Sequence, residues 1–554
     1  MAVSWRRFPL AALALLACLS SRAAHAQTPY LVKDINPGSE NGAPYPLYDA
    51  GGTLLFAAND ATVLPPDASS PSSNLQLWKS DGTTAGTTMV KAVSPYGLAL
   101  PLAFVNAGGK IYFDASSNGT PADICRELWT TDGTEVGTVV AASACPDSSF
   151  LMSSVAVIGG RMFFIGTGPS TGKELWTSDG TQAGTILLRD LWAGSGDGIG
   201  SGDAARLIVL GDRVLFGAQD GVVGFEPWIS DGSPGGTALL TETASGSAGG
   251  VTNLTAAGPL AYFFGTGGIW RTDGTAAGTM NLAAAAGGAG TPGILAGAAF
   301  FNGAIHSSGG KNVVDLWRTD GTAAGTAVLK TFTLGSLLRA PQEFVTVGDT
   351  LYFVATTGNL GQELWKTDGT SAGTVPVKDI RGAGESSFPG RLARVGGLLY
   401  FVADDGIHGY EAWRTDGTEA GTVMLGDIAP GIAPAFDPAA IRTQFVASGS
   451  RIFFQANDGP HGFELWAIDA PQSGTGGTGG VGAGGGAGGA GGGAGTGGSA
   501  GRGGNSGVGG ASLTGGGGCG CALGGSPAGL LSVGVALSAL VLRRRARRRV
   551  ILPP

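Results

Sequence analysis

One short segment recurs nine times along this chain and constrains the fold more than any other feature. Residues 363–374 read ELWKTDGTSAGT, and related segments surround a tryptophan that returns at a mean spacing of about 48 residues. This spacing is typical of propeller blades and exceeds that of leucine-rich or ankyrin repeats. The tryptophans are Trp78, Trp129, Trp176, Trp228, Trp270, Trp317, Trp365, Trp413 and Trp466.

Each repeat predicts four short strands and no helix. Turn sequences such as Asp405-Gly406 and Asp416-Gly417 separate short runs rich in β-branched and aromatic residues, and no run has the period of an amphipathic helix. Four antiparallel strands per repeat, arranged around a ring, form a β-propeller. In one repeat the four runs are 393–397, 398–402, 411–414 and 422–425.

The two ends of the repeat region complement each other. The chain offers an isolated fourth run at 30–35, whereas the last repeat stops after its third run at 464–469. If the N-terminal strand completes the last blade, neither end leaves an unpaired edge. We therefore predict an all-β propeller of nine four-stranded blades in one ring closed by that strand. The alternatives are eight blades plus an insertion around 287–310, or two smaller propellers.

The N-terminus reads as a secretory signal peptide over residues 1–26. Arg6 and Arg7 precede an apolar run, and Ala24-His25-Ala26 forms an A-x-A cleavage site after Ala26. We therefore expect an exported protein. A competing interpretation makes Cys18 a lipoprotein acceptor.

The C-terminal part predicts a tether followed by an anchor. After the propeller region, 27–470, residues 471–518 are rich in Gly with Ala, Ser and Thr, a composition typical of a flexible linker. Residues 519–554 contain Cys519 and Cys521, a short hydrophobic run and six terminal arginines. This run is short for a permanent membrane span, which suits a transient sorting signal. A simple single-pass transmembrane anchor is the alternative.

Two resemblances to known families follow from these motifs. The tryptophan segment resembles the ELWxxDGT repeats of bacterial secreted proteins, which implies a repeat scaffold without a settled activity. The tail resembles the MYXO-CTERM sorting tails of myxobacterial surface proteins. That resemblance implies processing near Cys519 or Cys521 by a sorting machinery, with membrane association through the tail and display at the cell surface.

Charge and cysteine usage narrow the partners. The net charge is −8, but nine basic residues lie in the signal and the extreme tail, so the exported body carries about −17. Such a body is a poor nucleic-acid binder. Cys125 and Cys145 are the two cysteines of the repeat region, and each lies ten residues from Glu135. A hairpin centred there would place them opposite each other, which predicts a disulfide.

The Asp-Gly-Thr turns admit a structural and a metal-binding interpretation. Asp caps its own turn while Gly adopts a positive φ, which is ordinary turn chemistry. The alternative is calcium held by aspartate and carbonyl oxygens, although each turn supplies a single carboxylate. We predict no other cofactor. The calcium candidates are Asp81, Asp132, Asp179, Asp368 and Asp416, with Asp231, Asp273 and Asp320 in equivalent positions.

Residues suited to catalysis are few. His408 and His461 occupy equivalent Asp-Gly-x-His-Gly turns, and none of the common nucleophile, metalloprotease or phosphate-binding motifs is present. We interpret the tryptophans as core and expect Pro227 to make its strand exposed or bulged. The leading hypothesis is a non-catalytic surface scaffold for binding or adhesion to an envelope protein or glycan. The alternatives are a propeller glycan hydrolase or lyase, and a structural coat or matrix protein.

Overall fold

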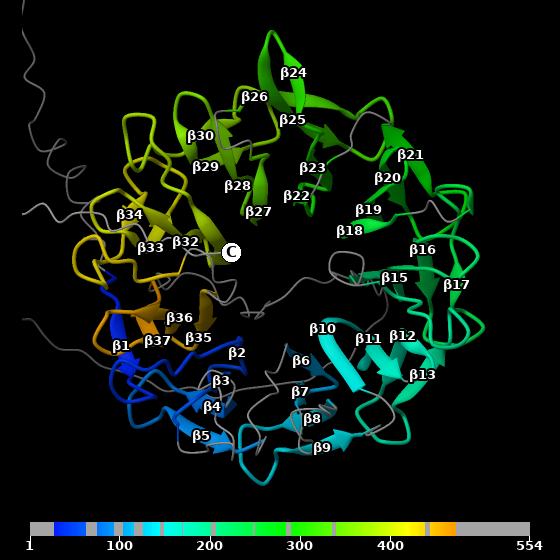
Figure 1. The fold of residues 1–554 in the computed structure, drawn as a ribbon, viewed down its shortest axis with the longest axis horizontal. Helices are drawn as coiled ribbons and strands as arrows, with labels where there is room; N and C mark the ends of the chain where they lie inside the picture. Colours follow the sequence, from blue (N-terminus) through cyan, green and yellow to red (C-terminus); the bar gives the residue numbers. More distant parts are fainter. Residues whose placement is uncertain are drawn as a thin grey trace, which may run out of the picture. The chain divides into compact units, whose positions relative to one another are not determined.

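The chain forms nine antiparallel sheets arranged in a ring (Figure 1). Strands and irregular connections make up the described part of the chain, which contains no helix. The predicted nine-bladed β-propeller is confirmed. The computed structural model describes residues 27–61, 75–93, 103–115, 126–143, 149–168, 170–200, 206–246, 250–283, 288, 290–334, 339–437 and 444–471.

Blades are numbered here in chain order, and each begins with the strand nearest the centre of the ring. Blades 1 to 4 consist of β2 (Leu47–Asp49), β3 (Leu54–Ala58), β4 (Gln76–Ser80) and β5 (Thr88–Lys91); β6 (Phe104–Ala107), β7 (Lys110–Ala115), β8 (Glu127–Thr131) and β9 (Val139–Ala142); β10 (Ser149–Ile158), β11 (Arg161–Gly168), β12 (Gly172–Ser178) and β13 (Ile186–Arg189); β14 (Leu207–Leu210), β15 (Arg213–Ala218), β16 (Glu226–Ser230) and β17 (Ala238–Leu239).

The remaining five blades repeat this order, with one extra strand in blade 6. They consist of β18 (Thr252–Ala257), β19 (Leu260–Gly265), β20 (Gly268–Thr272) and β21 (Met280–Ala283); β22 (Gly293–Leu295), β23 (Ala298–Asn302), β24 (His306–Ser308), β25 (Lys311–Thr319) and β26 (Ala327–Thr333); β27 (Gln342–Val347), β28 (Thr350–Thr357), β29 (Gly361–Thr367) and β30 (Val375–Pro376); β31 (Gly390–Val395), β32 (Leu398–Asp404), β33 (Tyr410–Thr415) and β34 (Val423–Met424); β35 (Val446–Ser448), β36 (Arg451–Asn457), β37 (Phe463–Asp469) and β1 (Tyr30–Lys33).

The N-terminal strand closes the ring, as predicted. β1 pairs antiparallel with β37, with Leu31 opposite Trp466, and so completes the sheet of blade 9. The side-chain amide of Gln27 adds a hydrogen bond to the carbonyl of Asp469 (2.7 Å). The first and last described segments of the propeller therefore stabilise the same blade.

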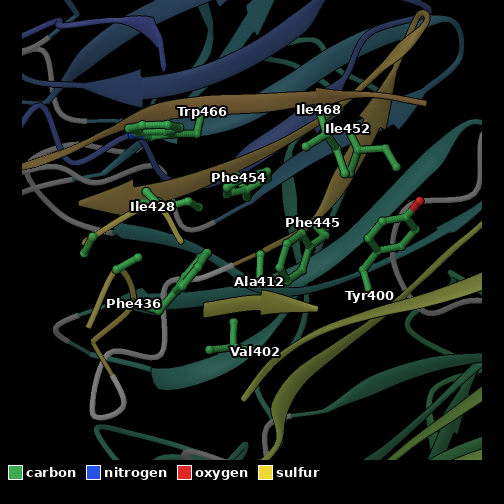
Figure 2. Packing of buried hydrophobic residues seen from close by; sticks show 13 residues of the cluster. Tyr400, Val402, Ala412, Ile428, Phe436, Phe445, Ile452, Phe454, Trp466 and Ile468 are labelled. Atoms are coloured by element: carbon green, nitrogen blue, oxygen red, sulfur yellow. The ribbon is translucent and has the colours of Figure 1, made fainter. Parts of the chain in front are cut away.

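The hydrophobic core lies between neighbouring blades. Figure 2 shows the layer between blades 8 and 9, where Tyr400 and Val402 of one sheet face Phe454 and Ile468 of the other. The aromatic rings of Phe445 and Phe454 lie 5.3 Å apart, a separation at which such pairs attract. Eight similar clusters surround the ring, so each blade depends on its neighbours for burial.

The repeated tryptophans occupy these layers, but their burial is uneven. Six are buried, whereas Trp176, Trp270 and Trp317 are half-buried. The interpretation of the tryptophans as core is therefore confirmed for the six. They are Trp78, Trp129, Trp228, Trp365, Trp413 and Trp466.

Pro227 does not make its strand exposed or shift its pairing with β15. Pro227 is buried and lies directly opposite Gly217. Its carbonyl accepts the N–H of Leu240 (2.8 Å), so its nitrogen also faces the outer strand β17. The missing donor therefore falls on the outer side of the ladder, where one lost bond is tolerated.

The degenerate repeat near 287–310 forms a true blade with an inserted hairpin. β24 pairs with the start of β25 (311–313) and β23 with its end (316–319), while β26 pairs with β25 along 313–318. In Figure 1 this hairpin projects outward beyond the neighbouring blades. The alternative of eight blades plus an insertion is therefore wrong, because the insertion lies within a ninth blade.

Several sequence predictions fall outside the described residues. These are the signal peptide with Ala26, the linker beyond Pro471, the tail with Cys519 and Cys521, and the pair Cys125 and Cys145. The described part of the chain contains no helix that is long and apolar enough to cross a membrane.

Candidate binding face

The blade topology separates the connections into two faces of the ring. In an antiparallel meander the 1–2 and 3–4 connections lie at one end of the strands, and the 2–3 connections lie at the other with the links to the next blade. We call the first the turn face and the second the loop face. The predicted calcium candidates lie on the turn face, in 3–4 connections such as 81–87.

Each Asp-Gly-Thr turn satisfies its own polar groups. In blade 1, Oδ1 of Asp81 accepts the backbone N–H of Thr83 (2.8 Å) and the Thr83 hydroxyl (2.7 Å). The Thr83 hydroxyl in turn accepts the N–H of Gly86 (2.9 Å), and Gly82 has a φ of 85°. The same bonds recur at the other candidates, Asp132, Asp179, Asp368 and Asp416, and at Asp231, Asp273 and Asp320.

These turns hold their aspartates as anions. Hydrogen bonds from Thr370, first from its hydroxyl and then from its backbone, lower the pKa of Asp368. Gly373, five residues further on, leaves room for this carboxylate, because a Cβ there would lie 2.1 Å from it. Among the described residues no group of three His, Cys, Asp or Glu side chains could hold a metal ion. The geometry therefore accounts for the aspartates as turn caps.

The loop face is built on buried glutamates. Glu464 is the second residue of β37, the third strand of blade 9. It is fully buried and accepts backbone N–H groups from Ile35 (2.9 Å), Asn36 (3.2 Å) and Gly42 (2.7 Å). These donors belong to the connection between β1 and β2. A Cβ at Gly42 would lie 2.4 Å from the carboxylate, so glycine is needed there. One side chain thus fixes a connection between two blades.

We call a buried side chain that accepts N–H groups from the connection to the next blade a clamp, and the same arrangement recurs in other blades. Glu174 accepts N–H groups from Leu191 (3.0 Å) and Gly198 (3.0 Å), and Glu363 accepts the N–H (2.9 Å) and hydroxyl (2.6 Å) of Ser387. Glu226 and Glu411 bind their own following connections in this way.

Burial shifts the acidity of these clamps. Desolvation raises the pKa of Glu363 to about 7 and the pKa of Glu464 to about 8, against the opposing effect of their hydrogen-bond donors. In blade 1 a neutral amide occupies the same position, and Gln76 accepts the N–H of Val93 (2.8 Å). A neutral group is therefore compatible with the clamp.

Two histidines lie on the loop face in equivalent turns. Nδ1 of His408 lies 2.7 Å from Oδ2 of Asp405, and Nδ1 of His461 lies 2.7 Å from Oδ2 of Asp458. The hydrogen bond to Asp405 raises the pKa of His408. Blade 4 forms the same turn around Asp220 with a valine in place of the histidine. The histidines are therefore not required for the turn itself.

An inner belt of polar side chains lies near the loop-face ends of the innermost strands. Ser154 and Gln444 occupy equivalent positions in the innermost segments of their blades, and each bonds to the next blade. Ser154 accepts the N–H of Leu207 (2.8 Å), and Gln444 accepts the N–H of Leu47 (3.0 Å). Glu343 makes the same kind of contact with the N–H of Leu392 (3.3 Å). Asn253, Glu343 and Arg391 occupy this position with φ values of 57°, 55° and 60°, a left-handed conformation that is uncommon outside glycine.

The buried glutamates and the inner belt were not among the predicted site residues. The glutamates had a signal, because Glu recurs two residues before the tryptophan in Glu127, Glu174, Glu226, Glu363, Glu411 and Glu464. The belt had none, because its residue type differs from blade to blade.

The chain matches no family model and no curated protein. Among solved structures, a puromycin hydrolase shares 13% identity with a TM-score of 0.36, over 77% of this chain and 60% of that one. BamB from Moraxella catarrhalis shares 13% identity (TM-score 0.33, 66% and 96% covered). TolB from Acinetobacter baumannii shares 12% (TM-score 0.26, 56% and 79% covered). The chain therefore spans 60% of the length of the hydrolase, and similarities at this level do not extend to function.

Proposed function

We propose that this protein is a non-catalytic scaffold displayed at the bacterial cell surface, and that its loop face binds a protein or glycan of the envelope. The observation that carries the proposal is the anchoring of the loop face by buried carboxylates such as Glu174, Glu363 and Glu464. Connections that are fixed before binding lose little conformational entropy when a partner arrives. Rigid loops on a ring suit recognition without requiring catalytic groups.

The proposed location rests on the sequence at both ends. A signal peptide at 1–26 implies export, and the linker at 471–518 would separate the propeller from its anchor. The resemblance of 519–554 to MYXO-CTERM tails supports attachment by a sorting machinery, with processing near Cys519 or Cys521. The resemblance to ELWxxDGT repeats supports a scaffold role.

The loop face carries exposed apolar tips in blade 8. Ile407, in the 2–3 connection, is 68% exposed, and Ile432, in the link to blade 9, is 77% exposed. The two connections touch, since a Cβ at Gly409 would lie 2.8 Å from the carbonyl oxygen of Ile432. Exposed apolar side chains on two adjacent, anchored loops are typical of a surface that contacts a partner.

A cell-binding experiment tests this proposal. Cells displaying the full chain would be compared with cells displaying the Ile407→Glu/Ile432→Glu double variant, for adhesion to envelope protein and polysaccharide arrays. Val136→Glu is the matched control, because Val136 is 89% exposed on the turn face. We expect adhesion to fall at least about tenfold only in the double variant. Equal adhesion of all three chains would contradict the proposal, and turnover of a bound glycan would favour a hydrolase or lyase.

The proposed anchoring has its own test. Mass spectrometry of surface-extracted protein should detect no peptide from Leu530 onward, because the sorting signal would have been removed. Recovery of the intact C-terminus would favour the simple transmembrane anchor.

A further inference from the structure

The outer edge of blade 6 differs from every other outer edge of the ring. β26 has seven residues, whereas the outermost strands of the other blades have two to four. β26 pairs with β25 alone among the described strands. Short edge strands protect a sheet against unwanted pairing, so a long one offers a template for an added strand.

The direction of the backbone groups along β26 follows from two hydrogen bonds. The N–H of Leu334 donates to the carbonyl of Asn312 (2.9 Å) and so faces β25. Because the direction alternates along a strand, Thr331 and Thr333 direct their backbone groups outward. The carbonyl of Thr333 confirms this, since it accepts the N–H of Gly358 from blade 7 (3.0 Å). The N–H and C=O of Thr331 and the N–H of Thr333 thus face away from the sheet.

A groove of about 510 Å³ lies beside this edge. Residues 330–334 form one wall and residues 357–359 of blade 7 form another, with Lys311 and Trp365 completing the lining. A volume of this size is in the range of binding sites for small ligands or short segments. An extended chain of four residues, about 13 Å long, matches the exposed edge of β26.

The lining favours a peptide over a sugar. Trp365 is only 5% exposed, because Phe332 packs against its ring (centroids 5.1 Å apart) and Lys330 lies over it. A covered ring cannot provide the open aromatic surface on which sugars stack. The outward backbone groups of Thr331 instead provide a donor and an acceptor for another strand.

Charge indicates the kind of peptide. Lys311 is exposed in the lining, and Lys330 also lines the groove, where its Nζ donates to the carbonyl of Thr374 (2.7 Å). Both are positive, which favours an acidic side chain in the groove. A second copy of this chain fits less well, because pairing β26 with β26 would bring the lysines of two chains to one edge.

We propose that β26 accepts an extended, acidic peptide segment of another protein as an additional antiparallel or parallel strand. This inference goes beyond the proposed binding function, because it names a second surface and the chemistry of its partner. It concerns a different surface from the apolar tips of blade 8. The two proposals therefore fail separately, since loss of one contact leaves the other in place.

A matched pair of variants tests the added strand. Thr331→Pro removes the outward N–H without removing a backbone hydrogen bond to β25, and proline is tolerated at such edge positions. Thr331→Val keeps the N–H and, like proline, removes the hydroxyl that bonds to Asp315. A phage-displayed library of linear octapeptides would be panned against the full exported chain, with counter-selection against Thr331→Pro. Fluorescence anisotropy would then measure the enriched peptides, and thermal melting would compare both variants.

We expect enriched peptides that contain an acidic residue among β-branched ones. Their affinity should fall at least about tenfold in Thr331→Pro and less than about threefold in Thr331→Val, with equal melting temperatures. Failure to enrich any peptide over the counter-selection would overturn the proposal, as would equal affinity for both variants. Light scattering that finds a dimer of the wild type and a monomer of Thr331→Pro would identify a second copy as the occupant and overturn it too.

Discussion

Lys91, on the outer strand of blade 1, lies over the ring of Trp129 in blade 2. Its Nζ is 6.0 Å from the ring centroid and donates a hydrogen bond to the carbonyl of Thr138 (2.7 Å), at the end of the next blade's turn. A cation in this position interacts with the ring and with a main-chain dipole at once. The same arrangement occurs at four other blade junctions, through Lys33, Arg189, Lys330 and Lys378.

Three of the four tryptophans without this cation are half-buried, whereas the fourth, Trp466, is buried although Gly426 stands at the equivalent position before it. The equivalent residues before the half-buried Trp176, Trp270 and Trp317 are Ala142, Thr241 and Ala283. We therefore expect Lys91→Met to lower the free energy of unfolding by about 1 to 2 kcal/mol, from a lost cation–π contact and hydrogen bond. Denaturant melts would measure this. Lys110→Met, at an exposed position, is the control, and an equal effect of both changes would contradict the role of Lys91.

Ring closure by β1 predicts a large effect from a small deletion. Removing residues 27–36 would take away β1 together with the Ile35 and Asn36 donors to Glu464. The outer edge of β37 would then be unpaired, and a buried carboxylate would lack two of its partners. We expect a lower melting temperature and aggregation. A circular permutant that places this segment after Asp469 should restore stability, and failure of the permutant together with a mild deletion would argue against closure.

The clamp of blade 8 predicts a pH dependence. Burial raises the pKa of Glu411 to about 8, and its buried Oε2 lacks a hydrogen-bond partner in the described structure. The folded state holds the proton of Glu411 more tightly than the unfolded chain does. The protonated carboxyl therefore contributes its full stabilisation below about pH 4.5, and this contribution is lost as the pH rises toward 8.

Glu411→Gln mimics the protonated clamp and provides the measurement. It should match the wild type near pH 5 and exceed its unfolding free energy by at least about 1 kcal/mol at pH 8.5. Glu419→Gln, on an exposed turn of the same blade, should show no such difference. A Glu411→Gln variant that is less stable at both pH values would show that the clamp is ionised when folded.

The turn face predicts little response to calcium. Asp179 accepts two hydrogen bonds from Thr181 within its own turn, so metal removal should leave the fold unchanged. We expect melting temperatures with excess chelator and with millimolar calcium to agree within about 1 °C. A larger calcium-dependent increase that disappears in Asp179→Asn would restore the metal-binding interpretation.

The register of blade 2 supports a test of the disulfide. Leu128 lies opposite Ala142, a pair centred on Glu135, as Cys125 and Cys145 would be. Mass spectrometry of protein isolated without reductant should find the two cysteines in one linked peptide. Reduction should then lower the unfolding free energy by about 2 to 4 kcal/mol. Free thiols at both positions would contradict the pairing.

The sequence by itself determined the blades and their closure. Each strand is encoded locally by a short apolar run and is bounded by turn residues such as Asp416-Gly417. The number of repeats gave the number of blades. The unmatched runs at 30–35 and 464–469 revealed the closing pair because an edge needs a partner.

Tertiary structure alone decided what the loop face and the outer edges present. Gly42 bonds to Glu464 across 422 positions, and its donor is a backbone N–H that every residue except proline carries. The acceptor glutamate recurs in the sequence, but no residue type identifies which backbone N–H will bond to it. The groove beside Thr331 likewise depends on how β26 lies relative to residues 357–359 of blade 7. The sequence of β26 alone does not reveal that placement. Repetition encodes local structure, whereas the contacts between repeats arise only when the ring closes and the chain folds against itself.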